Sequence, residues 1–139
     1  MYTYETKLRV RYGETDQMGY MYYGNYAQFY EVARVEMLRN LGLTYKGFEE
    51  EGIMMPVLEL KCKYIKPAYY DDEILIKIVI KEIPASRIVF FYELFNEKNE
   101  LINLGETTLV FVDMKTKRPS RAPEDFLSKI KPYFSKTEK

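Results

Sequence analysis

Apolar and polar residues alternate with a period of two at the start of the chain and through its second half, which predicts strands with one buried face. The predicted strands are residues 7–12, 58–64, 74–81, 88–95 and 101–112. The segment at 88–95 is apolar on both sides apart from Glu93, as in a central strand. A polar hairpin turn at 96–100 joins it to the last strand, in which Gly105 suggests a bulge.

The period changes to that of a helix at Asn25. Asn25 suits an N-cap with Gln28 three residues later, as in a capping box, and Gly42 suits the stop. One helix of about four turns is predicted between them. Its apolar face holds Tyr26, Phe29, Tyr30, Ala33, Met37 and Leu41. A shorter C-terminal helix is predicted at 123–134, with a buried side made of Phe126, Leu127, Ile130 and Phe134.

This order of elements predicts a two-layer α+β domain. Consecutive strands joined by short turns form an antiparallel sheet, and one amphipathic helix covers one face of it. The segment 46–52 is polar and contains glycine, so it is expected to be a connection. Residues 1–139 show no repeat or linker and are expected to form a single domain, with 135–139 frayed. Long apolar strands predict that an edge strand pairs with a second copy, in a homo-oligomer whose sheet continues across subunits.

Composition excludes several classes of function. Lysine plus arginine and aspartate plus glutamate number 21 each, so the chain lacks the charge of a nucleic-acid binder. No apolar run is long enough to span a membrane, and the N-terminus does not resemble a signal peptide. Cys62 is the lone cysteine, which favours a reducing, cytoplasmic location. Histidine is absent, which excludes Ser–His–Asp and Cys–His catalysis and any imidazole-bound zinc.

The candidate chemistry lies between the first strand and the long helix. Asp16 sits in a glycine-broken loop, and Tyr23 follows seven residues later where the helix begins. A helix N-terminus presents N–H groups that lack intrahelical acceptors and can hold a developing oxyanion. A carboxylate opposite them could attack a carbonyl or activate water. The simpler alternative is that Asp16 only caps or turns the loop.

The same loop resembles the active-site signature of hotdog-fold acyl-CoA thioesterases of the 4-hydroxybenzoyl-CoA thioesterase family. That signature reads here as Asp16, Gly19, Tyr23, Asn25 and Tyr26. The helix that follows and the segment 64–72 also resemble the family, and the likeness spans about residues 7–125. The resemblance implies a hotdog fold, in which a long antiparallel sheet wraps around one central helix, and assembly as dimers or tetramers.

The resemblance also implies roles for these residues. Asp16 would be the general base or the nucleophile on the thioester, and the main-chain N–H of Tyr23, helped by Gly24, would polarise the carbonyl. Gly19, Gly24, Asn25 and Tyr26 would bind substrate. Many bacterial members carry histidine where Tyr23 stands; a main-chain contact survives that change, but any imidazole contribution is lost. No metal and no cofactor are implied.

Coenzyme A carries phosphates that need cationic or main-chain donors. Lys66 and Arg87 are the candidates taken as substrate-binding residues. The run 115–121 contributes further basic side chains, which are equally consistent with ordinary surface. Glu14 is either a second carboxylate facing the same side as Asp16 or an ion-paired group. Met54 and Met55 would line an acyl tunnel or fill the core.

The sequence therefore predicts an acyl-CoA thioesterase that releases a carboxylic acid and coenzyme A. The alternative is a non-catalytic hotdog module that binds acyl-CoA or acyl-carrier protein, and turnover of a panel of acyl-CoAs separates the two. A hotdog dehydratase is disfavoured because that chemistry in related families generally uses a histidine. A purely structural oligomer is disfavoured because a loop with three glycines and a lone acid contributes little to packing.

Overall fold

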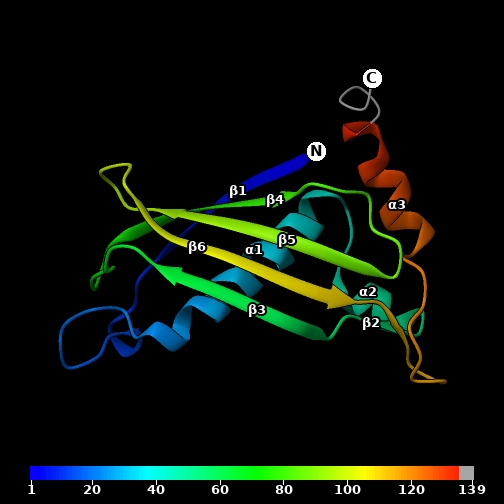
Figure 1. Ribbon diagram of the computed structural model, residues 1–139, viewed down its shortest axis with the longest axis horizontal. Coiled ribbons are helices and arrows are strands. Elements are labelled where there is room, and N and C mark those ends of the chain that lie inside the picture. The colour runs from blue at the N-terminus through cyan, green and yellow to red at the C-terminus, as the bar shows by residue number, and fades with distance from the viewer. Residues whose placement is uncertain (135–139) are drawn as a thin grey trace.

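A computed structural model describes residues 1–134, and the predicted fraying of 135–139 lies outside them. Five antiparallel strands form one sheet in the order β1-β4-β5-β6-β3 (Figure 1). The strands are β1 (Tyr2–Arg9), β3 (Val57–Tyr64), β4 (Glu73–Ile80), β5 (Arg87–Phe95) and β6 (Leu101–Val110). A two-stranded ribbon of β2 (Ile53–Met54) and β7 (Val112–Asp113) lies apart from that sheet. As predicted, β5 is central.

The long helix α1 (Tyr26–Asn40) crosses one face of this sheet, and the core lies between them (Figure 1). Tyr30, Ala33 and Met37 of α1 are fully buried. They face the alternate residues of the sheet that point inward, such as Ile76 and Phe90. Gly42, with a φ of +81°, ends the helix as predicted, because the left-handed region costs glycine nothing.

Two short helices complete the chain. The segment 46–52, expected to be a connection, instead contains most of the helix α2 (Tyr45–Glu50). The Thr44 hydroxyl accepts the Gly47 N–H at 2.9 Å and caps this helix, which is too short to show a clear period in the sequence. The predicted C-terminal helix is confirmed as α3 (Glu124–Ile130), followed by a 3₁₀ turn (Lys131–Tyr133). Its predicted buried residues are buried. No helix within residues 1–134 is long and apolar enough to cross a membrane.

Three details of the sheet differ from the sequence-based expectations. β1 begins at Tyr2, five residues earlier than predicted, because Tyr2 points into the core and pairs with Ile80. β3 pairs with β6 instead of the next strand along the chain. Gly105 makes no bulge, because it pairs regularly with Cys62 and Tyr92; the register shifts instead between Val57 and Glu59 of β3 and between Leu94 and Phe95 of β5, where β5 pairs with β6.

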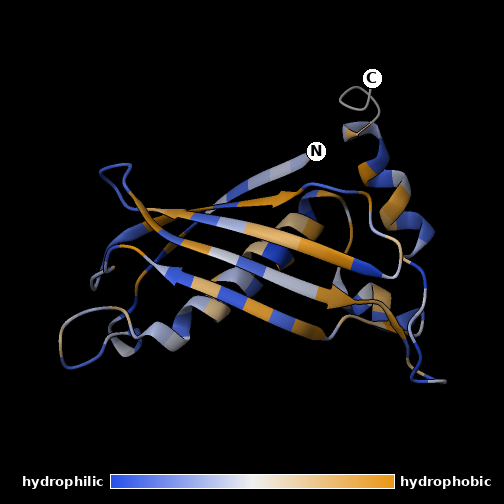
Figure 2. Ribbon diagram, viewed as in Figure 1, coloured by the Kyte–Doolittle hydropathy of each residue, from blue (hydrophilic) through white to orange (hydrophobic). Residues whose placement is uncertain are grey.

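The two edges of the sheet are covered unequally. β1 keeps its inward side chains under α1, where Tyr2 is 2% exposed. β3 is exposed along almost its whole length, with Leu58 at 53% and Leu60 at 43% exposed. Apolar and polar residues alternate along this open edge (Figure 2). β3 is therefore the edge that an additional strand would cover.

Candidate active site

The loop between β1 and α1 is built around Glu14. Its carboxylate accepts the Arg11 N–H at 2.7 Å and pairs with the Arg11 guanidinium at 2.9 Å, which closes a 3₁₀ turn (Tyr12–Glu14). This turn is why the first strand ends before residue 12. The Glu14 carbonyl accepts the Tyr22 N–H at 2.7 Å and the Asn25 side-chain amide at 2.8 Å. Of the two alternatives predicted for Glu14, the structure therefore supports the ion-paired group. Glu14 also joins both ends of the loop.

Asn25 does not act as the predicted side-chain cap. Its side chain accepts no N–H of α1, because its amide donates to the Glu14 carbonyl instead. A 3₁₀ turn (Tyr23–Asn25) leads directly into α1. Asn25 therefore ties the beginning of the helix to the far side of the Asp16 loop.

Asp16 lies at the tip of this loop and is exposed. Its Oδ1 accepts the N–H groups of Met18 at 2.9 Å and Tyr20 at 3.3 Å. Gly19, with a φ of +81°, allows the chain to reverse so that the Asp16 N–H reaches the Tyr20 carbonyl at 2.9 Å. Within residues 1–134 the other carboxylate oxygen, Oδ2, makes no hydrogen bond. Asp16 thus turns the loop with one oxygen and keeps the other available.

The main-chain N–H groups of Tyr23 and Gly24 find no acceptor in the described part of the chain. The carbonyls of the same peptides are held: that of Tyr22 by the Asn25 N–H at 3.0 Å, and that of Tyr23 by the Tyr26 N–H. The Tyr64 hydroxyl also donates to the Tyr23 carbonyl, at 3.3 Å. A peptide fixed by its carbonyl and free at its N–H is suited to donate to a ligand.

Gly24 leaves room for the ring of Tyr22. A Cβ at this position would come 2.7 Å from the Cε2 atom of the Tyr22 ring. The Tyr22 ring, which lies 4.6 Å from the Tyr23 ring between centroids, therefore covers Gly24. Because Gly24 has no side chain, the Tyr22 ring can pack against the 3₁₀ turn at Tyr23–Asn25.

Asp16 and Tyr23 line one cavity of about 330 Å³. The loop contributes Asp16, Tyr20, Met21 and Tyr23; α1 contributes Tyr26; and the end of β3 contributes Tyr64, Ile65, Lys66 and Pro67. The structure thus brings together the carboxylate and the helix start that the sequence singled out. It adds Tyr20 and Tyr64, which sequence reasoning missed. The alternation along β3 indicated that Tyr64 points inward. It could not show that Tyr64 lies near the start of α1, because that depends on the order of the strands in the sheet.

Two tyrosines of this cavity, Tyr26 and Tyr64, remain neutral hydroxyls at physiological pH. Burial raises the pKa of Tyr26 to about 12. Desolvation, together with interactions with Cys62, raises the pKa of Tyr64 to about 12. The Tyr64 ring packs edge-on to Tyr26 and Tyr23, at centroid distances of 5.3 Å and 6.3 Å. The cavity is therefore walled by aromatic rings whose hydroxyls can donate hydrogen bonds.

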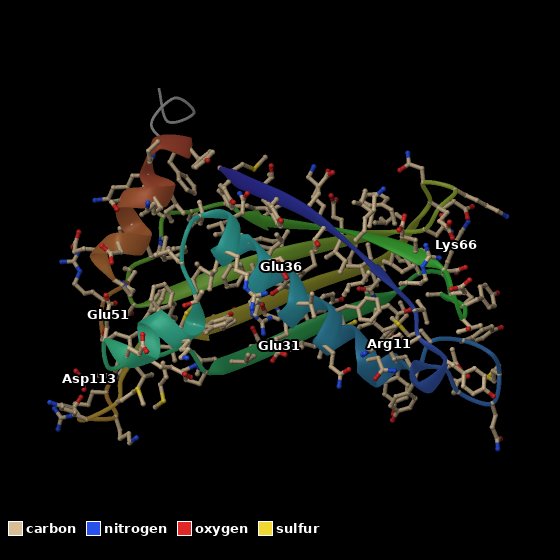
Figure 3. The ribbon with its side chains drawn as sticks, turned by 180° about the vertical axis from the view of Figure 1, so that it is seen from behind. Arg11, Glu31, Glu36, Glu51, Lys66 and Asp113 are labelled. Atoms are coloured by element: carbon tan, nitrogen blue, oxygen red, sulfur yellow. The ribbon has the colours of Figure 1, made fainter. Side chains whose placement is uncertain are left out.

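The two basic residues predicted to bind substrate lie apart. Lys66 lines the cavity and pairs with Glu100 at 2.6 Å, which holds the pKa of that carboxyl below its usual value. Figure 3 shows Lys66 at the same end of the molecule as Arg11, opposite Asp113. Arg87 opens β5 and lines a separate cavity of about 240 Å³ with Lys81 and Glu106. Within one chain, Arg87 is not brought to Asp16.

Several other polar and sulfur-containing side chains make contacts within the fold, away from Asp16. Asp71 and Glu73 form ion pairs with Arg9, at 3.7 Å and 3.5 Å. Met55 packs against the core from a partly buried position, while Met54 pairs with Val112 in the two-stranded ribbon. Cys62 is half-buried, with its sulfur 3.2 Å from the Tyr30 hydroxyl.

Comparison with known proteins identifies the family. The model of the thioesterase-like superfamily matches residues 10–130. The chain belongs to this superfamily. It is 32% identical over 124 residues to the acyl-CoA thioester hydrolase YbgC of Escherichia coli, covering 89% of this chain and 92% of that protein. It is 30% identical over 119 residues to the putative acyl-CoA thioesterase YneP of Bacillus subtilis, covering 86% of each.

One solved structure matches nearly the whole chain. The DHNA-CoA thioesterase from Staphylococcus aureus superposes with a TM-score of 0.92 at 34% identity, covering 99% of this chain and 95% of that one. The expected hotdog fold, the family resemblance and the expected enzyme class, a thioesterase, are thereby confirmed.

Proposed function

We propose that this thioesterase hydrolyses acyl-CoA in the cavity between Asp16 and the beginning of α1. The observation that carries the proposal is the shared cavity: it is lined both by Asp16, whose carboxylate keeps one oxygen free, and by Tyr23, whose main-chain N–H has no acceptor within residues 1–134. The relatives named above as acyl-CoA thioester hydrolases support the substrate class.

In this mechanism the thioester carbonyl accepts a hydrogen bond from the Tyr23 N–H, assisted by that of Gly24. Negative charge that develops on the oxygen is stabilised by these donors and by the positive end of α1. Asp16 acts either as a general base, taking a proton from water as its oxygen adds to the carbonyl carbon, or as a nucleophile that forms an anhydride which water then cleaves. In both routes the carbon–sulfur bond breaks, and coenzyme A leaves as the thiolate.

Binding roles follow from position. Gly19 shapes the loop that carries Asp16, Asn25 anchors the donor peptides, and Tyr26 forms the floor beside Tyr64. Lys66 is the basic residue of this cavity that would meet a phosphate of coenzyme A, exchanging its contact with Glu100 for one with the ligand. Arg87 would serve this site only from a second copy.

The acyl group would sit among aromatic rings. Tyr20, Tyr23, Tyr26 and Tyr64 offer flat apolar surfaces with hydroxyl tips, which suits an aryl group with polar substituents. The similarity to a thioesterase that acts on DHNA-CoA supports including such a substrate among those tested.

We also propose that the protein self-associates through β3, as a dimer or as a tetramer made of two such dimers. The exposed apolar residues Leu58 and Leu60 on an unpaired edge support this assembly. A cytoplasmic location remains a prediction from the single free cysteine.

The decisive experiment measures steady-state turnover of aliphatic and aryl-CoA thioesters by the wild type and by Asp16→Asn. Loss of a positioned catalytic carboxylate lowers kcat by about 10²–10⁴-fold. Tyr23→Phe is the matched control: it keeps the main-chain donor, so kcat should change little. Full turnover by Asp16→Asn would remove Asp16 from the mechanism. Binding of the thioesters by the wild type without turnover would select the non-catalytic alternative.

A further inference from the structure

One hydrogen bond joins the edge of the sheet to the turn that begins α1. The hydroxyl of Tyr64, the last residue of β3, donates to the main-chain carbonyl of Tyr23 at 3.3 Å. Tyr64 is held opposite Asn103 by the register between β3 and β6. The next N–H along the chain, that of Ile65, donates to the Ile102 carbonyl at 3.0 Å. The sheet therefore fixes the backbone from which this hydroxyl reaches the turn.

The peptide group that accepts this bond carries one of the two unpaired N–H groups of the turn. A carbonyl and the N–H of the following residue belong to one peptide, so the Tyr23 carbonyl shares its peptide with the Gly24 N–H. That N–H has no acceptor within residues 1–134. The carbonyl also accepts the Tyr26 N–H, so both of its lone pairs are used. Hydrogen bonds in a chain polarise one another, so two donors on this carbonyl make the Gly24 N–H a stronger donor.

The neighbouring N–H of the turn lacks this support. The Tyr23 N–H shares its peptide with the Tyr22 carbonyl, which accepts the Asn25 N–H at 3.0 Å. No side chain within residues 1–134 donates a hydrogen bond to the Tyr22 carbonyl. The two candidate donors therefore differ in one respect: a side chain polarises the peptide of the Gly24 N–H, and a main-chain bond alone holds that of the Tyr23 N–H.

The Tyr64 side chain is suited to this task. Its ring packs edge-on to Tyr26 and Tyr23, which orients the hydroxyl. Desolvation, together with interactions with Cys62, raises the pKa of the hydroxyl to about 12, so it keeps its proton at neutral pH. A carbonyl oxygen can only accept, so the direction of the bond is settled. The ring contacts do not need the hydroxyl, so phenylalanine at this position removes the hydrogen bond and leaves the ring in place.

We propose that Tyr64 is a positioning residue, whose hydroxyl holds the Tyr23–Gly24 peptide and strengthens its N–H as a donor to the thioester oxygen. Negative charge on that oxygen develops in the transition state, so a stronger donor raises kcat more than it lowers KM. The kinetic part of this inference rests on the proposed hydrolysis. The effect on the peptide itself does not, because the hydrogen bond exists without substrate.

Steady-state kinetics on Tyr64→Phe test the kinetic part, with benzoyl-CoA or octanoyl-CoA, whichever the wild type hydrolyses faster. The value of kcat should fall by about 3–10-fold, as for one hydrogen bond, and by less than the roughly 10²–10³-fold lost with an oxyanion donor itself. KM should change by less than about twofold, because the aromatic wall remains. Tyr70→Phe is the matched control, since Tyr70 is 56% exposed against 52% for Tyr64 and packs against Tyr12, outside the cavity. Its kcat should equal that of the wild type. An unchanged kcat in Tyr64→Phe, or a rise in KM alone, would overturn the role.

Amide NMR spectra test the peptide without substrate. Loss of a hydrogen bond to a carbonyl lowers the ¹⁵N chemical shift of the amide in the same peptide. In Tyr64→Phe the Gly24 signal should therefore move upfield, while the Tyr23 signal moves less. Glycine amides resonate apart from most others, and the chain has 7 glycines, so this signal can be followed. A Gly24 signal that stays in place, or equal shifts of both amides, would overturn the polarisation. Full turnover by Asp16→Asn would instead remove the proposed mechanism and leave this result standing.

Restoring a donor gives a third measurement. Replacing Tyr64 by para-aminophenylalanine keeps the ring and places an N–H where the hydroxyl was. This variant should recover part of the kcat and of the Gly24 shift lost in Tyr64→Phe, and melting temperatures show that both variants are folded. A folded variant that matches Tyr64→Phe in kcat and in the Gly24 shift would show that Tyr64 does not act by donating to the Tyr23 carbonyl.

Discussion

At the scale of single residues, Gly105 shows how a glycine positions the core beneath the site. A Cβ at this position would come 2.6 Å from Tyr30 Cε2 and closer still to Tyr30 Cζ and the hydroxyl oxygen. The Tyr30 ring cannot move aside easily, because it stacks on Tyr92 at 4.2 Å and its hydroxyl bonds to Asn103. The sequence suggested a bulge here because a strand glycine indicates either a bulge or close approach of another group.

Gly105→Ala should therefore destabilise the protein by about 1–3 kcal/mol, as overpacking of a rigid core usually does. Thermal unfolding followed by circular dichroism measures the effect. Gly13→Ala is the control, because nothing lies within 4 Å of a Cβ built at Gly13. Equal melting temperatures for the two variants would show that Tyr30 can move away from residue 105.

At the scale of elements, the junction between the loop and α1 decides where the unpaired donors point. At the start of α1, the side-chain amide of Asn25 donates a hydrogen bond to the Glu14 carbonyl at 2.8 Å. At the other end, Asn40 donates to the Tyr2 hydroxyl at 3.1 Å. The two side chains make comparable hydrogen bonds, but only Asn25 lies beside the peptides of Tyr23 and Gly24.

Asn25→Ala should lower kcat more than it changes KM, because the donor peptides lose an anchor while the cavity walls remain. Asn40→Ala should leave kcat unchanged. Each variant should lose a similar amount of stability, about 0.5–1.5 kcal/mol for one hydrogen bond. Acyl-CoA kinetics and melting temperatures on both variants check this, and equal kcat values would show that Asn25 acts on stability alone.

The elements themselves were largely predictable from periodicity. The helix at Tyr26–Asn40 and the strands from Val57 onward follow patterns that only one type of element satisfies. The start of β1 escaped prediction because the tyrosines at positions 2 and 4 are amphipathic and do not mark a buried face. The helix α2 escaped prediction because six residues make too few turns to show a helical period. The sequence allows a threonine cap at Thr44, but only the structure shows that its hydroxyl accepts the Gly47 N–H.

At the scale of the whole molecule, pairing between distant segments lies beyond sequence periodicity. Asp16 and Tyr23 were found together because one loop holds them, whereas Tyr64 joins them only because β3 lies at the sheet edge beside β6. For the same reason the sequence could not place Arg87, since the distance from the start of β5 to the site depends on the order of the strands in the sheet. Residues close in sequence can be grouped without a structure, and those joined by sheet order cannot.

The abundance of buried tyrosine predicts how the whole molecule responds to alkali. Burial raises the pKa of Tyr26 to about 12, above its ordinary value of 10.0, and burial also raises the pKa values of Tyr30 and Tyr92. A group that holds its proton more tightly when folded contributes stability that is complete below the unfolded pKa and is lost as pH rises toward the folded pKa. The melting temperature should therefore stay level from neutral pH to about pH 9.5 and fall between about pH 10 and 12. Differential scanning calorimetry measures this fall, and tyrosinate absorbance at equilibrium should show the buried hydroxyls ionising together with unfolding. Complete ionisation of all tyrosines near pH 10 with the fold intact would contradict the burial on which this expectation rests.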